Sequence, residues 1–204
     1  DEDEIVGGVE GDKRQVDVLY EDQGDLIRRH AGDGVTQPPG IRHRVVEASA
    51  NIEVIEIGVP AEHVTTIDHE MTLPNGKGDP MREWDGQRFV HHLKDGAVWQ
   101  PFRIPGFTAR DTGISDGTKG VAGIQVVRTD GKTPPPSKHD ADIHFTFVME
   151  GSMTLTAEGQ DPRDLQPGDA FVIPPGMVAQ YTNCSPDLEL LEAALRGDFA
   201  TTLL

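Results

Sequence analysis

The sequence is poor in the residues that tie a chain together covalently or carry it through a membrane. Cys184 is its single cysteine, so no disulfide can form within these 204 residues, and a reducing compartment is expected. No apolar run approaches the roughly 20 residues that span a bilayer. No secretory signal is visible either, although the sequence starts without Met. We therefore expect a cytoplasmic protein without a membrane segment.

Positive charge is also scarce. The sequence has 18 Lys and Arg against 35 Asp and Glu, which gives a formal net charge of −17. Such a charge repels phosphate backbones and anionic membrane surfaces, so we expect neither nucleic acid nor membrane as a partner. Glycine and proline, in contrast, are abundant, with 23 and 15 residues. This composition indicates many turns, as in an all-β protein, and argues against long helices.

The sequence contains an internal repeat. Residues 32–57 align with residues 168–193 without a gap, and a shorter match upstream pairs residues 9–12 with 149–152. The long segments share Gly-Asp at the start, Pro-Pro-Gly in the middle, a serine, and two glutamates, of which the second leads out of the last strand. This ordered set of matches predicts two copies of one structural unit.

Short apolar runs bounded by these turns predict strands in both copies. The first copy gives strands at 42–48 and 50–59, the second of which alternates apolar and acidic residues. The second copy gives five strands, at 143–150, 152–158, 170–173, 178–183 and 188–195. The last of these could also be scored as a helix, but its equivalent at 50–59 is β-branched, so a strand is favoured.

The residues around the first Pro-Pro-Gly turn resemble a motif of a known family. The cupin superfamily has a second motif of the form G-x5-P-x-G-x2-H-x3-N. Gly32, Pro38, Gly40 and His43 match it, and Glu47 stands in place of the final asparagine. The resemblance thus places His43 in the position of a metal ligand.

The second copy keeps the turns of this motif but not its histidine. Gly168, Pro174, Gly176 and Asn183 match, whereas Ala179 occupies the histidine position. The turns alone are therefore expected to be sufficient for the fold, and His43 is the part that needs a functional explanation.

The first cupin motif, G-x5-H-x-H-x3–4-E-x6-G, is only partly present. In the second copy Ser137 and His139 fall in its two histidine positions, and His144 falls in its glutamate position. In the first copy Glu4 falls in the glutamate position, and the two histidines would lie before residue 1. A complete set of family ligands is thus visible in neither copy.

The resemblance implies an all-β fold of two double-stranded β-helix (cupin, jelly-roll-like) barrels in tandem. We expect a first barrel at 1–58, a connector at 59–106 with a strand candidate at 87–93, and a second barrel at 107–204. Cupins commonly form dimers, so the resemblance also implies a homodimer.

In the first barrel the resemblance implies that His43 and Glu4 bind a divalent transition metal. Imidazole and carboxylate together suit Fe, Mn, Ni, Cu or Zn, and this ligand set does not distinguish among them. If His43 points inward, strand alternation puts Val45 and Glu47 inward as well. In the alternative interpretation, His43 is an ordinary strand residue and Glu4 belongs to a solvated acidic tail, in which Glu2 is a rival ligand.

In the second barrel the candidates are His139, His144 and Tyr181. They could line a pocket as proton donors or hold a weakly bound ion with Asp140 or Asp142, but a barrel that has lost its metal is the favoured interpretation. Alternation places Tyr181 on the same face as Ala179. In the connector, a substrate-lining role for Trp99 or Arg103 remains an alternative to simple packing.

The function expected from these features is that of a metal-dependent enzyme acting on a small organic substrate. The specific form we favour is a dioxygenase for an aromatic or dicarbonyl compound. The alternatives are a non-oxidative isomerase or lyase and a non-catalytic bicupin that binds a small molecule. A cupin fold by itself does not name the reaction.

Overall fold

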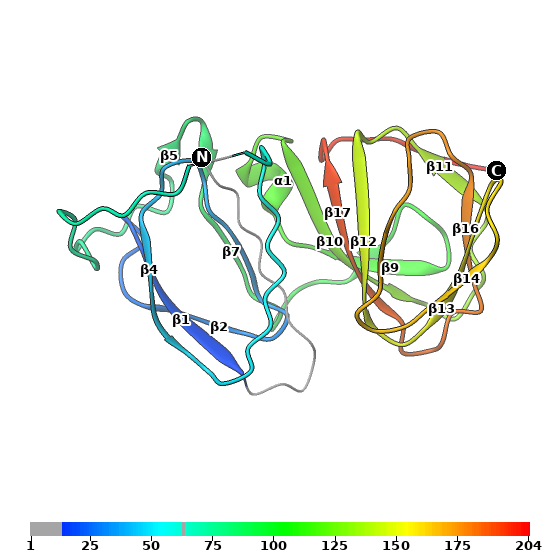
Figure 1. Cartoon of the computed structure of the whole chain (residues 1–204), viewed down its shortest axis with the longest axis horizontal. Coiled ribbons are helices and arrows are strands. Elements are labelled where there is room, and N and C mark those ends of the chain that lie inside the picture. Colours follow the sequence, from blue (N-terminus) through cyan, green and yellow to red (C-terminus); the bar gives the residue numbers. More distant parts are fainter. Residues whose placement is uncertain (1–13, 63) are drawn as a thin grey trace. The chain divides into compact units, whose positions relative to one another are not determined.

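The structure is a computed structural model that describes residues 14–62 and 64–204. It divides into two compact units. The first ends at Gly96 and also includes Gly117–Lys119, and the second comprises Ala97–Asp116 and Gly120–Leu204. Figure 1 shows that both units are built from strands, which confirms the all-β class; in the described residues only α1 (Ile114–Gly117) is helical. No helix among them has the length and apolar character needed to cross a membrane.

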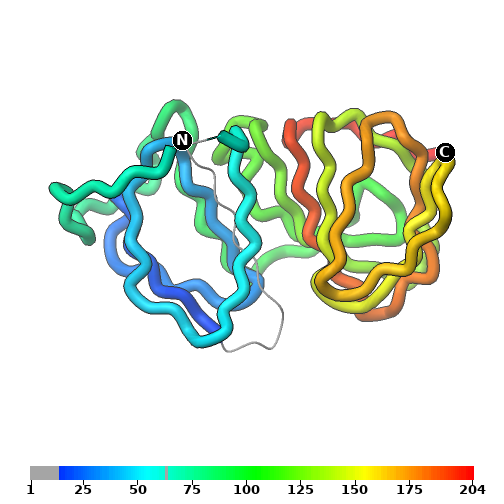
Figure 2. The backbone as a smooth tube through the Cα atoms, viewed as in Figure 1, coloured from blue at the N-terminus to red at the C-terminus, as the bar shows by residue number. Residues whose placement is uncertain are grey.

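The second unit consists of two antiparallel sheets. The six-stranded sheet has the order β15-β12-β17-β10-β9-β8, and the five-stranded sheet has the order β14-β13-β16-β11-β18. The chain passes back and forth between the sheets, as the tube in Figure 2 traces. The strands of the first sheet are β8 (Gln100–Pro101), β9 (Phe107–Asp111), β10 (Ala122–Thr129), β12 (Ile143–Glu150), β15 (Ala170–Val172) and β17 (Glu189–Leu195). Those of the second are β11 (Ser137–His139), β13 (Met153–Ala157), β14 (Arg163–Leu165), β16 (Ala179–Thr182) and β18 (Thr201–Leu203).

The hydrophobic core of this unit lies between the two sheets. Phe107, Val127 and Val148 come from the first sheet, and Met153 and Tyr181 come from the second; all five are buried in one cluster. Burial of these apolar surfaces is the main force that holds the two sheets face to face.

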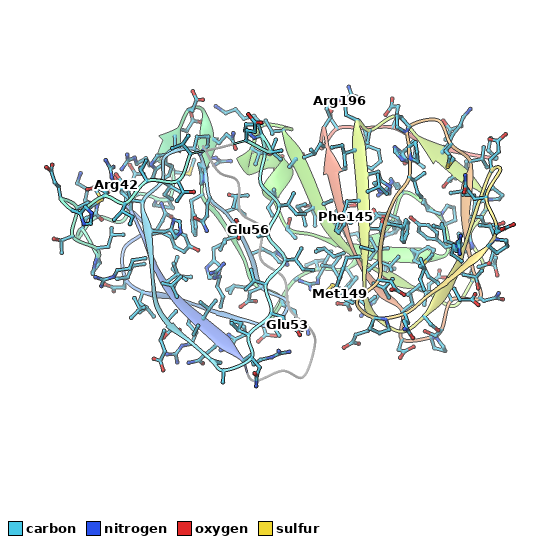
Figure 3. The ribbon with its side chains drawn as sticks, viewed as in Figure 1. Arg42, Glu53, Glu56, Phe145, Met149 and Arg196 are labelled. Carbon is cyan, nitrogen blue, oxygen red and sulfur yellow. The ribbon has the colours of Figure 1, made fainter. Side chains whose placement is uncertain are left out.

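The five strands predicted in the second copy are confirmed. β12, β13, β15, β16 and β17 coincide with them to within two residues. Along β12 the buried residues alternate, with His144 and Thr146 facing inward while Phe145, labelled in Figure 3, is half-buried on the other face. β17 is buried over five consecutive residues because it lies between β10 and β12, which explains its continuous apolar run.

The first unit contains smaller sheets. A three-stranded sheet has the order β2-β1-β4, and two further strand pairs are β3 with β7 and β5 with β6. A core cluster around Val18, Tyr20, Val35 and Trp84 packs against these strands. The strands are β1 (Gln15–Tyr20), β2 (Ile27–His30), β3 (Gly34–Thr36), β4 (His43–Ala48), β5 (Glu83–Trp84), β6 (Gln87–Arg88) and β7 (Val90–His92).

The strand predicted at 50–59 is wrong, because this segment pairs with no strand among residues 14–62 and 64–204. Glu53 and Glu56, labelled in Figure 3, are exposed on it, and Ile52 is only half-buried. The repeat equates the segment with β17, which pairs with β12. The repeat equates β12 in turn with residues 3–10, which lie outside the described residues.

Candidate functional site

Five polar side chains from different parts of the second unit meet inside it. His144 comes from β12, Glu192 from β17, Tyr181 from β16 and His139 from β11, while Arg103 comes from the turn between β8 and β9. β12 and β17 pair side by side, with Thr146 opposite Glu192, so His144 and Glu192 come close together. The four strand residues are buried, and the Arg103 side chain is 22% exposed.

The guanidinium of Arg103 is the hub of this cluster. Its Nε donates to Thr201 Oγ1 at 2.9 Å, its Nη1 lies 2.8 Å from Glu192 Oε2, and its Nη2 lies 3.0 Å from His144 Nε2. Its carbon Cζ lies 4.2 Å and 4.6 Å from the ring centroids of Phe102 and Phe199, which hold it by cation–π contact. A guanidinium has five N–H groups, so two remain for a further acceptor.

Glu192 is a buried anion that depends on this cation. Its side chain is 4% exposed, and burial alone would raise its pKa. The charge of Arg103 and the imidazole of His144 outweigh burial and hold the pKa of Glu192 at about 2. Glu192 is therefore ionised at neutral pH, and the pair with Arg103 carries no net charge.

The contacts of His144 determine where its proton sits. Arginine is always a donor, so Nε2 of a neutral His144 accepts from Arg103 and Nδ1 carries the hydrogen. Nδ1 is buried and has no hydrogen-bond partner among the described residues. A buried donor without a partner costs about 1–3 kcal/mol, which favours an acceptor atom, from water or a ligand, at this position.

Both ring nitrogens of His139 form hydrogen bonds with the backbone. The backbone N–H of Ala141 donates to its Nδ1 at 3.2 Å, and its Nε2 lies 2.9 Å from the carbonyl oxygen of Ile173, to which it donates. Only the neutral form protonated at Nε2 satisfies both bonds. Burial, followed by the nearby His144, lowers the pKa of His139, so the ring is neutral near pH 7.

Tyr181 supplies a phenol that keeps its proton. Its ring packs edge-on against Phe107 and Phe171, with centroid distances of 6.0 and 5.9 Å. Burial and then the negative charge of Glu192 raise the pKa of Tyr181 far above its usual value. The burial pattern of β16 confirms that Tyr181 and Ala179 share the inner face.

Four of these side chains, those of Arg103, His139, His144 and Tyr181, line one small pocket. Its cavity volume is about 20 Å³, close to the size of a single water. The wall also includes Ser137 and the exposed Lys138 on β11, together with Gln180. The pocket therefore has one atom-sized polar position inside and a polar rim outside.

The second-barrel residues do not fit a metal ion as they stand. Both nitrogens of His139 are used by the backbone, and Nε2 of His144 faces a guanidinium. Over residues 14–62 and 64–204, no group of three or more His, Cys, Asp or Glu side chains converges in a metal-binding arrangement. The structure thus brings His139, His144 and Tyr181 together, but around a fixed cation.

Of the two metal-ligand candidates in the first barrel, the structure describes His43 alone. Glu4 lies outside the described residues. His43 is the first residue of β4, is exposed, and its ring centroid lies 6.0 Å from that of Tyr20. All six residues of β4 are exposed, so the alternation expected for Val45 and Glu47 is not seen among them. Metal binding by His43 and Glu4 stays a prediction.

The sequence did not indicate the roles of two residues of the cluster, Glu192 and Arg103. Glu192 was expected to lead out of its strand, yet it lies in the middle of β17 and is 3% exposed. Its signal was a lone acidic residue within a continuous apolar run, which is rare unless the charge is paired. Arg103 was considered only for lining a substrate, and nothing local indicates that it reaches Glu192.

Comparisons with known proteins agree with this architecture. A model of the Cupin domain matches residues 123–192. Two solved structures resemble the chain over its length. A mutant of oxalate decarboxylase from Bacillus subtilis has a TM-score of 0.64 at 14% identity, covering 100% of this chain and 66% of that one. A putative glyoxylate-induced protein from Pseudomonas aeruginosa has a TM-score of 0.65 at 15% identity, covering 96% of this chain and 67% of that one.

A third solved structure resembles only part of the chain. KdgF from Halomonas sp. has a TM-score of 0.44 at 24% identity, covering 52% of this chain and 93% of that one. No curated protein sequence matches the chain. The family match lies in the second unit, and the two long structural matches extend over both units. Residues 123–192 thus match the Cupin domain, and the two long structural likenesses show a cupin-type fold over both units.

Proposed function

We propose that the protein binds a compact organic molecule in its second barrel through a carbonyl or carboxylate oxygen. The observation that carries this proposal is the guanidinium of Arg103, which has two N–H groups left over in a pocket that Tyr181 also lines. Hydrogen bonds from a guanidinium to oxygen are among the strongest that proteins make. The buried Nδ1 of His144, which lacks a partner in the described structure, would be a third donor.

The chemistry that such a set supports is proton transfer without oxidation. Arg103 would stabilise negative charge as it develops on the substrate oxygen. The neutral phenol of Tyr181, whose pKa burial and Glu192 raise, would hold or donate a proton to the same oxygen. This arrangement favours the isomerase or lyase class over a simple binding module, because a fixed guanidinium beside a protonated phenol can stabilise negative charge that develops on a substrate oxygen.

The size of the pocket restricts the ligand. A cavity of about 20 Å³ accepts one oxygen atom at its centre, so the rest of the molecule would extend to the rim, which Lys138 and Gln180 line. We therefore propose a molecule of a few carbon atoms. Only these local hydrogen-bond donors would attract an anionic ligand, because the chain as a whole has a net charge of −17 and repels anions.

Binding of pyruvate, followed by NMR on the full chain, tests this proposal. We expect Tyr181→Phe to weaken binding about 5-fold, because it removes one hydrogen bond worth about 1 kcal/mol. Acetone should bind more weakly than pyruvate, and Arg163→Ala, which changes an exposed arginine of the same unit, should bind like the wild type. Equal binding of pyruvate by the wild type and Tyr181→Phe would contradict the proposal.

A metal-dependent dioxygenase centred on the first barrel is the second candidate. It is favoured by one observation, namely that His43 lines an open pocket of the first unit together with Gln37, Ile41 and Leu73. His43 and Glu4 would hold the ion, and the bound ion would supply redox or Lewis-acid chemistry. The metal content of His43→Ala, compared with wild type, tests this candidate; unchanged content would refute the assignment of His43.

We propose a homodimer in the cytoplasm with no nucleic-acid partner. Light scattering of the purified full chain tests the dimer, and a monomer at micromolar concentration would contradict it.

A further inference from the structure

We infer that the guanidinium of Arg103 replaces a metal ion at the centre of the second barrel. The barrel would thus carry a built-in cation, and removing Arg103 would open a transition-metal site between His144 and Glu192. This inference does not rest on the proposed function, because it concerns which cation neutralises the site and not which ligand enters it.

The two acceptors are spaced as metal ligands would be. Nε2 of His144 lies 3.5 Å from Oε1 of Glu192. Two atoms that each bind a tetrahedral zinc at about 2.1 Å lie about 3.4 Å apart. Oε1 of Glu192 also has no hydrogen bond among the described residues. A histidine nitrogen and a carboxylate oxygen are therefore preset at the right distance for one shared ion.

The same acceptors now face positive charge on Arg103. Nη1 lies 2.8 Å from Oε2 of Glu192, and Nη2 lies 3.0 Å from Nε2 of His144. Thr201 holds the third side of the guanidinium through Nε at 2.9 Å. Arg103 therefore already binds the imidazole and the carboxylate that a metal ion at this position would need as ligands.

Small residues make room for this side chain. The motif positions of two further histidines hold Ser137 and Ala179, which lie opposite each other in the pairing of β11 with β16. Both line the same pocket as Arg103. The space in which the motif would hold two imidazoles therefore contains one guanidinium, as expected if the arginine takes the role of the ion.

Glu192 explains why some cation has to be present. Its carboxylate is 4% exposed, and a buried carboxylate without a counter-charge is strongly unfavourable. His139 does not supply that charge, because it is held neutral by its two backbone bonds. Arg103 is the only Lys or Arg that forms an ion pair with Glu192 in the described part of the chain.

Metal uptake by the full-length Arg103→Ala variant tests the inference. The probe is Co²⁺, whose absorbance reports tetrahedral coordination, followed by competition with Zn²⁺. We expect Arg103→Ala to bind one more equivalent than the wild type, with a side-chain nitrogen shift at His144 in the NMR spectrum. Arg163→Ala, which keeps the same number of surface histidines, should bind no more than the wild type.

The double variant Arg103→Ala/Glu192→Gln separates a metal site from a general loosening of the barrel. It removes the carboxylate ligand and also the uncompensated charge, so we expect it to fold and to lose the extra equivalent. If folded Arg103→Ala takes up no extra Co²⁺, the inference is overturned. A shift of the wild-type His144 nitrogens on addition of Zn²⁺ would overturn it too.

Folding of Arg103→Ala is followed by circular dichroism, because its Glu192 charge is left buried alone. If the variant is unfolded in metal-free buffer, we expect Zn²⁺ to restore its fold, because an ion that binds only the folded state stabilises that state. The double variant should not respond. An Arg103→Ala chain that stays unfolded at saturating Zn²⁺, while the double variant folds, would contradict the inference.

Discussion

Nη1 of Arg103 lies 2.8 Å from Oε2 of Glu192, although one residue belongs to a turn and the other to the middle of a central strand. The Glu192 side chain is almost fully buried, whereas the Arg103 side chain is 22% exposed. The pair therefore ties the turn between β8 and β9 to the core of the six-stranded sheet. The position of Arg103 in the pocket depends on this ion pair.

Replacing Glu192 should destabilise the second barrel. We expect Glu192→Gln to lower the free energy of unfolding by about 2–3 kcal/mol, because it leaves Arg103 without its counter-charge. The loss is smaller than for a fully buried cation, since solvent reaches Arg103. Urea unfolding measures it. Glu158→Gln, an exposed glutamate in the same unit, should change the free energy by less than about 0.5 kcal/mol. Equal effects for both variants would contradict the burial argument.

Acid should weaken this barrel through the same carboxylate. The pKa of Glu192 is lowered from 4.5 to about 2, so its stabilising contribution is complete above pH 4.5 and is lost as the pH falls toward 2. The stability difference between wild type and Glu192→Gln should therefore shrink over this interval. Unfolding free energies measured at several pH values test it. A stability difference between the two proteins that stays constant down to pH 2 would contradict the assignment of this pH dependence to Glu192.

The phenol of Tyr181 should resist ionisation. Burial and the charge of Glu192 raise its pKa from 10.0, so its stabilising contribution is present below pH 10 and is lost as the pH rises above it. We expect the phenolate absorbance that disappears in Tyr181→Phe to develop only together with alkaline unfolding. A Tyr181 signal that titrates near pH 10 in the folded protein would contradict this.

His139 should be neutral and protonated at Nε2. Burial, and then the nearby His144, lower its pKa from 6.5, so its neutral form stabilises the fold above pH 6.5 and this contribution fades as the pH falls through the lowered value. Side-chain nitrogen NMR at neutral pH tests the tautomer, and His139→Asn identifies the signal. Protonation at Nδ1 would contradict the hydrogen bonds of His139 with Ala141 and Ile173.

Two glycines of the repeat should differ in their tolerance of alanine. Gly151 has a φ of +71°, and an added Cβ would lie 2.6 Å from the backbone nitrogen of Leu188. Gly168 has a φ of +94°, but nothing lies within 4 Å of such a Cβ. We expect Gly168→Ala to cost about 1 kcal/mol from its backbone conformation and Gly151→Ala to cost on the order of 3 kcal/mol. Similar unfolding free energies for the two variants would contradict the predicted clash.

Much of the second barrel could be predicted from its sequence. The strands β12 and β16 follow from alternation, which is a local property, and the turns that bound them are marked by Gly and Pro. The segment 50–59 alternates in the same way and nevertheless pairs with no strand in the part of the chain that the structure describes. Pairing depends on a neighbouring strand, and no property of the segment itself supplies one.

The site could be predicted only in part. Motif spacing identified His139 and His144, and alternation added Tyr181, since both rules operate along a single strand. The contact of Arg103 with Glu192 depends on how β17 lies in the sheet and on how a turn folds over it. Residues so far apart in the sequence leave no periodic signal. The polar centre of the pocket was therefore visible only in the structure.

The Pro-Pro-Gly turn of the second barrel and His139 hold each other in place. Besides the bond from Nε2 to Ile173, the backbone carbonyl of His139 accepts from the N–H of Gly176 at 2.7 Å. His139 could not swing toward a guest molecule without releasing that turn, so this wall is a rigid template. Adjustment to differently shaped guests would fall to the rim, where the exposed Lys138 can change rotamer at little cost, whereas Gln180 donates to the carbonyl oxygen of Pro134 at 2.8 Å. Selectivity for shape and selectivity for charge would then reside in different parts of the same pocket.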